Sequence, residues 1–198
     1  MNTSSGWDLV VIGSGPAGEA AAMRAAKSGM KVAMIEDQAQ VGGSCTHLGT
    51  IPSKALRHQV RQVIRHQRNP LLQGVADMPD VGWPQLVNKI RDVISAQVRV
   101  RSGFYFRNRV QVFQGRGRIA GEGRVQVQDR QEREWLLETR YIILATGSRP
   151  YHPEDVDFNH PRVYDSDTIL DMDHTPRNLI IYGAGVIGCE YASLFTGM

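Results

Sequence analysis

Residues 9–18 read Leu-Val-Val-Ile-Gly-Ser-Gly-Pro-Ala-Gly and decide the fold of the first part of the chain. A short, continuous apolar run is typical of a parallel strand that is covered on both faces. The glycine motif after it opens the alanine-rich segment 19–27, which favours a helix. Gly29 can end that helix, and the segment 31–36 resumes as a strand. The sequence therefore predicts a βαβ unit.

Each glycine of this motif has its own task in a dinucleotide-binding turn. Gly13 permits the tight turn, Gly15 lets a pyrophosphate approach, and Gly18 lets the helix pack closely on the strand. Glu36 ends the next strand, 18 residues after Gly18, near the spacing expected of a carboxylate that accepts ribose hydroxyls. Strand, turn, helix and acid together predict a dinucleotide site at a helix N-terminus. The expected contacts of this turn also include Ser14, Pro16 and Ala17.

A second glycine motif lies at 183–188, directly after an apolar run at 179–182 that is expected as a strand, and a new helix is expected to begin after the motif. Two such motifs suggest two dinucleotide sites on one enzyme. The contacts expected at the second site are Gly183, Gly185 and Gly188. The acid that would select between NAD and NADP should follow the motif by roughly 20 residues, beyond Met198, so this preference stays open. A purely structural turn is the alternative for the second motif.

Between the two motifs the periodicity changes from helical to strand-like. Amphipathic helices are predicted at 56–64 and 84–98. From Val110 apolar and polar residues alternate, which predicts an antiparallel β-meander at about 110–140. Glycines expected to mark its turns are Gly115, Gly117, Gly121 and Gly123. An apolar strand is expected next, at 141–144. Residues from about 148 to 176 are expected to form an irregular crossover, because they include four prolines.

Composition excludes several classes of protein. Of the 198 residues, 41% are hydrophobic and 22% charged, which is ordinary globular usage and excludes disordered and fibrous chains. A net charge of +3 is too small to indicate nucleic acid, and two cysteines exclude a disulfide-rich secreted scaffold. The polar start does not resemble a signal peptide, and no apolar run reaches membrane-spanning length. We expect a cytoplasmic protein with no nucleic-acid or membrane partner. No metal is expected either, since the six histidines lack metal-ligand spacing.

Residues 42–54 read Gly-Gly-Ser-Cys-Thr-His-Leu-Gly-Thr-Ile-Pro-Ser-Lys and resemble the redox segment of the flavin-dependent pyridine nucleotide-disulfide oxidoreductases. The run Ala-Thr-Gly at 145–147 and the long interval between the glycine motifs are also similar to that family, and the resemblance extends from Asp8 to Met198. It implies FAD at the first site and NAD(P)H at the second. The further FAD contacts that it implies are Gly42, Gly43, Ser44, Cys45, Lys54, Gly115, Ala145, Thr146 and Gly147.

One departure from the family bears on the reaction. Its disulfide reductases place two cysteines five positions apart, and here Thr50 stands five positions after Cys45. A hydroxyl can neither form a disulfide nor release a thiolate, so the dithiol relay is absent. Residues 45–58 and 145–153 resemble the family members that pass hydride from NADPH through FAD to NAD⁺ in ping-pong order. NADPH and NAD⁺ are therefore the expected substrates.

The resemblance also implies two catalytic residues. Lys54 would lie near the flavin N5 edge, where its charge would favour the anionic reduced ring. Glu190 matches the acid that faces this lysine, so we expect the two side chains to pair. A solvated helix lysine is the alternative for Lys54.

The expected fold is α/β: an FAD-binding doubly wound parallel sheet with an inserted antiparallel β-meander, in a domain that covers 1–176. Residues 177–198 would be the truncated start of a second Rossmann domain that binds NAD(P). The relatives pair through a C-terminal domain, so a homo-oligomer is expected of the parent protein. The 198-residue chain by itself is expected not to turn over.

Two other functions stay open. The protein could be another FAD-dependent NAD(P)H oxidoreductase or an oxidase, with Cys45 as its redox partner. It could also be a non-catalytic FAD-binding module whose arginines between 57 and 68 serve a partner or nucleic acid. A solvated helix face is the simpler interpretation of those arginines.

Overall fold

The computed structural model describes residues 2–71 and 81–198 of the chain. They form two compact units. Unit 1 comprises the residues up to 46 together with 96–148, and unit 2 comprises 47–95 together with 149–198. The expected domain limit between residues 176 and 177 does not coincide with a limit of either unit and stays a prediction.

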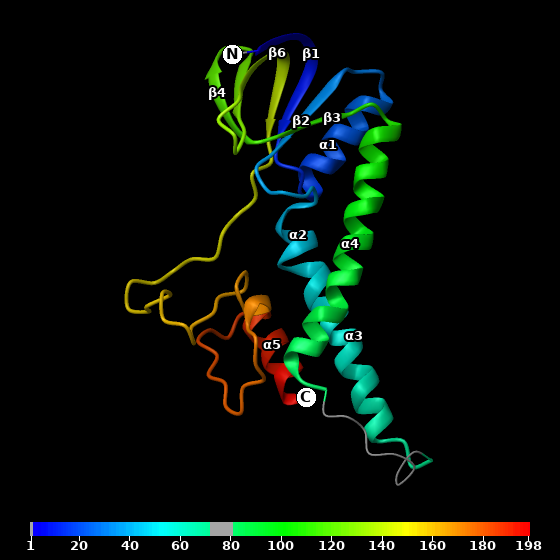
Figure 1. Ribbon diagram of the computed structural model, residues 1–198, viewed down its shortest axis with the longest axis vertical. Coiled ribbons are helices and arrows are strands. Elements are labelled where there is room, and N and C mark those ends of the chain that lie inside the picture. Colours follow the sequence, from blue (N-terminus) through cyan, green and yellow to red (C-terminus); the bar gives the residue numbers. More distant parts are fainter. Residues whose placement is uncertain (1, 72–80) are drawn as a thin grey trace. The chain divides into compact units, whose positions relative to one another are not determined.

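Unit 1 is built on a six-stranded sheet in the order β3-β2-β1-β6-β5-β4 (Figure 1). The strands are β1 (Asn2–Ile12), β2 (Val32–Glu36), β3 (Gln111–Gln114), β4 (Arg116–Gly121), β5 (Arg124–Gln128) and β6 (Glu134–Leu144). The pairs β1–β2, β1–β6 and β2–β3 are parallel, whereas β4–β5 and β5–β6 are antiparallel. The expected parallel sheet with an antiparallel meander is therefore confirmed.

The two faces of this sheet are covered by different layers. Two helical segments of unit 1 contribute to the core around this sheet: α1 (Pro16–Lys27) and the C-terminal half of α4 (Trp83–Arg107). Val11 of β1 lies in an apolar cluster with Ala22 of α1 and Tyr105 of α4. Its neighbour Val10 lies in a second cluster with Val125 of β5. Because successive side chains of a strand point to opposite faces, the apolar run of β1 is buried on both sides, as predicted.

Three details of the meander differ from the sequence prediction. We expected antiparallel pairing from Val110 onward, but β3 pairs in parallel with β2. The alternation of apolar and polar residues is the same in both pairing directions, so the pattern cannot distinguish them. Residues 134–144, expected as two strands, form the single strand β6, which pairs with both β5 and β1. Gly117, expected in a turn, lies inside β4, where an added Cβ would stand 3.2 Å from Ile35 side-chain atoms.

Unit 2 is helical. It contains α3 (Thr50–Gln67), the N-terminal half of α4, the short 3-10 helix η1 (Ile169–Asp171) and α5 (Val186–Thr196), while α2 (Gly43–His47) lies almost wholly in unit 1. Leu56 and Val60 of α3 form a core with Trp83 of α4 and Leu194 of α5. The Trp83 ring stacks on Phe195 at a centroid distance of 4.6 Å. The apolar faces predicted for the two helices thus supply buried residues of this core, although Val93 of the second face is 36% exposed.

The strand expected at 179–182 does not form. These residues carry no strand assignment, and Ile180 is 94% exposed. A parallel strand needs a neighbouring strand to bond its N–H and C=O groups, and within the described ranges 2–71 and 81–198 this segment pairs with none. The helix expected after it forms as α5.

Residues 149–176 of unit 2 hold one regular element, η1. A polar cluster organises this segment: His152 Nε2 lies 2.6 Å from Asp165 Oδ2, and the His152 ring stacks on Phe158. The backbone N–H of Thr168 donates to Asp165 Oδ1 at 2.8 Å. Burial by itself would raise the pKa of Asp165, but the hydrogen bonds from His152 and Thr168 outweigh it and hold the pKa below its usual value.

Candidate functional site

The first glycine turn is closed by backbone contacts that leave no room for side chains. Gly13 has a φ of +103°, and a Cβ there would stand 2.8 Å from the carbonyl carbon of Ala145 and closer still to its oxygen. A Cβ at Gly18 would stand 3.0 Å from the carbonyl carbon of Gly13 and would overlap its oxygen. Both positions require glycine, in agreement with the predicted tight turn and close helix packing. The Ala-Thr-Gly segment at 145–147 is brought to this turn because the Ala145 N–H donates to Ile12 O at 2.8 Å.

Helix α1 begins at this turn, with Gly15 as its N-cap and Pro16 at its first position. The Glu19 N–H donates to the carbonyl oxygen of Gly15 at 2.8 Å. The N–H groups of Ala17 and Gly18 precede this first hydrogen bond of the helix. Such donors, together with the positive end of the helix dipole, are suited to phosphate oxygens.

Gly42 and Gly43 approach the same turn. A Cβ at Gly43 would stand 2.7 Å from the Cα of Gly15, so the two backbones pass too closely for a side chain. The Gly42 N–H donates to Ser14 Oγ at 2.8 Å. Unit 1 thus brings together the two glycine segments that the sequence analysis singled out separately.

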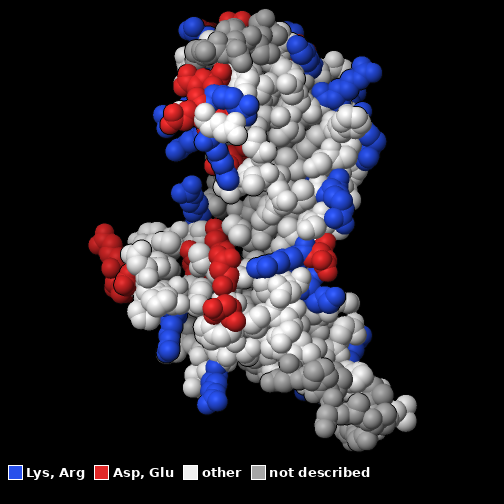
Figure 2. Space-filling view, in the orientation of Figure 1, with Lys and Arg blue, Asp and Glu red and all other residues white. Residues whose placement is uncertain are grey.

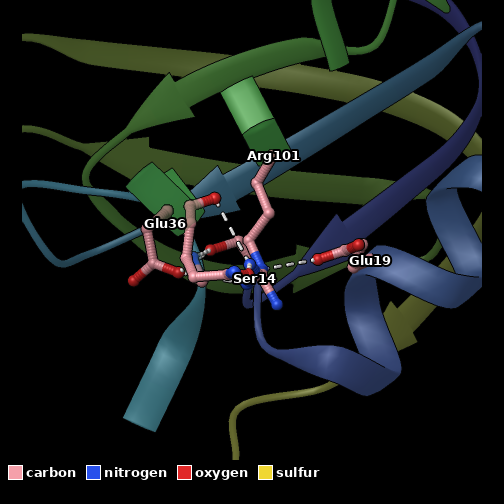
Figure 3. Close-up of polar contacts among 6 residues, drawn as sticks. Ser14, Glu19, Glu36 and Arg101 are labelled. Atoms are coloured by element: carbon pink, nitrogen blue, oxygen red, sulfur yellow. Dashed lines mark hydrogen bonds and ion pairs between the residues drawn. The ribbon is translucent and has the colours of Figure 1, made fainter. Parts of the chain in front are cut away.

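Glu36 is buried at the end of β2 and is held by hydrogen bonds. Its Oε2 accepts from the Ser14 N–H at 3.0 Å and from the Ser14 hydroxyl (Figure 3). Its Oε1 accepts from the Gln38 N–H at 2.9 Å. A carboxylate has about four acceptor sites, so these bonds leave capacity for a further donor. The chain of bonds Gly42–Ser14–Glu36 was not predicted, since a serine between two glycines carries no signal of its own.

Helix α2 follows Gly42. Ser44 is exposed, and Cys45 is a half-buried free thiol. Thr46 is fully buried, and its Oγ1 lacks a hydrogen-bond partner in the part of the chain that the structure describes. A buried hydroxyl without a partner costs free energy unless a ligand or water bonds it. Thr46 was missed by the sequence analysis because a threonine inside a short helix belongs to no motif that we used.

A cavity of about 480 Å³ lies beside Gly115 in unit 1. Its lining residues are Asp37, residues 111–115 and 129–131, Arg133 and Trp135. Gly115 N–H donates to Glu36 O at 2.8 Å, so the cavity is linked directly to the end of β2. A Cβ at Gly115 would stand 2.5 Å from Gln128 O, which explains the glycine at this position.

The second glycine turn, in unit 2, repeats the geometry of the first. Gly183 has a φ of +125°, and a Cβ at Gly188 would overlap the Gly183 carbonyl oxygen. The N-cap Gly185 has φ −74° and ψ 176°, against −64° and 179° at Gly15. The Cys189 N–H donates to Gly185 O at 3.0 Å, as the corresponding residue of α1 does. The turn forms although no strand precedes it.

Lys54 of α3 and Glu190 of α5 form an ion pair in unit 2, with 2.5 Å between Lys54 Nζ and Glu190 Oε1. The predicted pairing is confirmed, while the roles of both residues toward a flavin stay predictions. The Ser53 hydroxyl donates to Glu190 Oε2 at 3.4 Å. The Lys54 side chain is 60% exposed. The Glu190 side chain is 17% exposed. An ion pair whose cation is this exposed contributes little to stability.

Charges are intermixed elsewhere on the molecule. Figure 2 shows acidic and basic side chains distributed over the visible face. Among residues 2–71 and 81–198, three or more His, Cys, Asp or Glu side chains nowhere gather in a way that could hold a metal ion. Within the same described ranges, each helix is too short or too polar to cross a membrane.

The sequence is similar to proteins named soluble pyridine nucleotide transhydrogenase. It is 58% identical to the one from Pseudomonas putida (strain GB-1) and 54% identical to the one from Hahella chejuensis, each over 192 residues. These matches cover 97% of this chain and 41% of each relative, so the chain spans about two fifths of their length.

A solved structure has a similar fold: the Cu(II) complex of the HOCl-induced flavoprotein disulfide reductase RclA from Escherichia coli. Its TM-score is 0.82 at 28% identity, over 100% of this chain and 41% of that one. The family model described as pyridine nucleotide-disulphide oxidoreductase matches residues 7–198. Because that match covers nearly the whole chain, this protein belongs to the pyridine nucleotide-disulphide oxidoreductase family.

Proposed function

We propose that the chain binds FAD at its first glycine turn and that the protein transfers hydride from NADPH to NAD⁺ through this flavin. The observation that carries the FAD part is the joined set of Gly13, Gly15, Gly43, Ser14 and Glu36 in unit 1. Two observations support NAD⁺ as the hydride acceptor. Thr50 stands where a disulfide reductase needs its second cysteine, and the similar proteins are named transhydrogenases.

The residues of unit 1 fit a dinucleotide. The N–H groups of Ala17 and Gly18 would bind the pyrophosphate, and Glu36 would accept hydrogen bonds from the ribose hydroxyls. The buried Thr46 hydroxyl would gain the partner that it lacks in the described part of the chain. The cavity beside Gly115 would take the adenine. FAD, when bound, supplies the hydride chemistry, and the chain supplies binding and charge.

Cys45 fits this reaction better as a packing residue than as a redox partner. It is a free thiol, and Cys189, the other cysteine, lies in unit 2. A single thiol offers no internal disulfide that could store two electrons. A hydride acceptor that reacts directly with the flavin needs no such store, and NAD⁺ is an acceptor of this kind.

The proposal is tested by following the visible flavin band of the FAD-loaded full-length protein, which is first mixed with NADPH in the absence of oxygen and then with an NAD⁺ analogue or with oxygen. NADPH is expected to bleach the band, and an NAD⁺ analogue is expected to restore it faster than oxygen does. Faster recovery with oxygen would favour an oxidase that uses Cys45. Absence of bleaching in a protein that retains FAD would favour a non-catalytic FAD-binding module.

Lys54→Met is expected to slow flavin reduction by NADPH about tenfold to hundredfold, because a positive charge beside the flavin would stabilise the negative charge that develops there. FAD affinity should change little, since the side chain is exposed. Stopped-flow absorbance measures the rate. The matched control is Lys89→Met, which removes the same charge from an exposed position of α4. Equal rates in the two variants would exclude the proposed role of Lys54.

A further inference from the structure

Three side chains of α4 lie along the face that it turns toward α1. Gln97, Arg101 and Tyr105 are spaced four residues apart, so they follow one another on one side of the helix. Arg101 Nε lies 3.0 Å from Glu19 Oε2 (Figure 3). Its Nη1 donates to Gln97 Oε1 at 2.7 Å. All four residues belong to unit 1. The guanidinium is thus fixed from its own helix and directed at α1.

Glu19 occupies a position where a carboxylate works against the proposed ligand. It lies in the first turn of α1, directly after the N–H groups of Ala17 and Gly18. A negative side chain there stabilises the free helix end but repels a phosphate bound to the same turn. The side chain is only 23% exposed, so water screens its charge incompletely.

The glycine turn does not itself need this carboxylate. In the second turn, which has the same backbone geometry, the position of Glu19 is taken by Cys189. The Arg101 side chain is 15% exposed, and at the second turn a cysteine stands where this arginine meets an acid at the first. Glu19 and Arg101 are therefore a matched pair added to the turn and not a requirement of its fold.

The charges of Glu19 and Arg101 both influence the pKa of Tyr105. Burial raises the pKa of its phenol, and the nearby charge of Glu19 raises the pKa further, whereas Arg101 lowers it. The charges of Glu19 and Arg101 thus have opposite effects on the pKa of one buried phenol. Removal of Arg101 would leave the acid uncompensated beside the helix N-terminus.

We propose that Arg101 is a positioning residue that neutralises Glu19, so that the N-terminus of α1 can accept the diphosphate of a dinucleotide. This rests on the proposed FAD site. Arg101 acts through Glu19, and its effect therefore depends on phosphate charge and not on the adenosine part of the ligand.

The test compares the binding of ADP and of adenosine to the 198-residue chain by calorimetry. Arg101→Met is expected to weaken ADP binding about tenfold while adenosine binding is unchanged, because only ADP carries the phosphates that an unpaired Glu19 repels. Glu19→Gln combined with Arg101→Met should restore ADP binding to the wild-type level. Arg101→Lys should retain part of the ADP affinity, since the charge is kept but the fork geometry is lost. The matched control, Arg99→Met, removes an exposed charge from α4 and should leave both affinities unchanged.

Several outcomes would overturn the proposal. One is an Arg101→Met chain that binds ADP as tightly as the wild type does. Another is a loss of adenosine binding as large as the loss of ADP binding, which would mark a purely structural pair. A folded double variant that still binds ADP weakly would show that Arg101 does not act through Glu19. The double variant also keeps the test decisive where Arg101→Met does not fold. Failure of the wild-type chain to bind FAD would instead overturn the proposed function. If the wild-type chain binds FAD and the ADP affinity of Arg101→Met equals that of the wild type, only this inference is overturned.

Discussion

Gly18→Ala is expected to destabilise unit 1 by about 3 kcal/mol or more and to abolish FAD binding. The φ of Gly18 is not in the left-handed region, so the penalty is steric: the added Cβ would overlap the carbonyl oxygen of Gly13. That oxygen belongs to a turn fixed by hydrogen bonds and cannot move away cheaply. Urea unfolding gives the loss of stability, and an FAD titration gives the loss of affinity.

Gly15→Ala is the matched contrast in the same turn. A Cβ at Gly15 would meet only Gly43 Cα, at an ordinary contact distance of 3.9 Å, and the φ of −64° suits alanine. The free energy of unfolding should therefore change by less than about 1 kcal/mol. FAD affinity should still fall, because the methyl group would stand where the pyrophosphate approaches. Wild-type FAD affinity in Gly15→Ala, or wild-type stability in Gly18→Ala, would contradict this account of the turn.

Glu36→Gln is the second substitution with a large expected effect. The buried carboxylate accepts hydrogen bonds from the N–H groups of Ser14 and Gln38, one on each oxygen. An amide offers one oxygen and one NH₂ group, so one of these N–H groups would face another donor. An unsatisfied buried donor costs about 1–3 kcal/mol of stability.

FAD affinity of Glu36→Gln should fall about tenfold to hundredfold as well, because hydrogen bonds to a charged acceptor contribute about 1.5–3 kcal/mol. Fluorescence titration with FAD measures this loss. Glu122→Gln, at an exposed turn between β4 and β5, removes the same charge and should bind FAD like the wild type. Unchanged FAD affinity in Glu36→Gln would exclude the ribose role of this residue.

Local patterns predicted the first βαβ unit well. Glycine spacing, helix propensity and the apolar run at 9–12 act over short stretches, and each matches the structure. Two features depended on distant partners and were wrong: the direction of β3 and the strand at 179–182. Alternation does not specify the direction of pairing, and a strand cannot form without a neighbour to bond.

The candidate site divides in the same way. Gly13, Gly15 and Gly18 were assigned roles from spacing, and the backbone contacts explain two of them directly. The pairing of Lys54 with Glu190 was read from the family resemblance and not from the residues themselves. The bonds Ser14–Glu36 and Arg101–Glu19 were missed, because no periodicity links groups that meet only through tertiary packing.

The most direct test of the central claim is whether the purified 198-residue chain retains FAD. The chain is mixed with excess FAD, passed through a gel-filtration column and examined by visible absorption and circular dichroism. The predicted result is a folded protein that elutes with an equimolar amount of flavin, which Gly15→Ala loses while staying folded. A folded wild-type chain that elutes without flavin would contradict the claim.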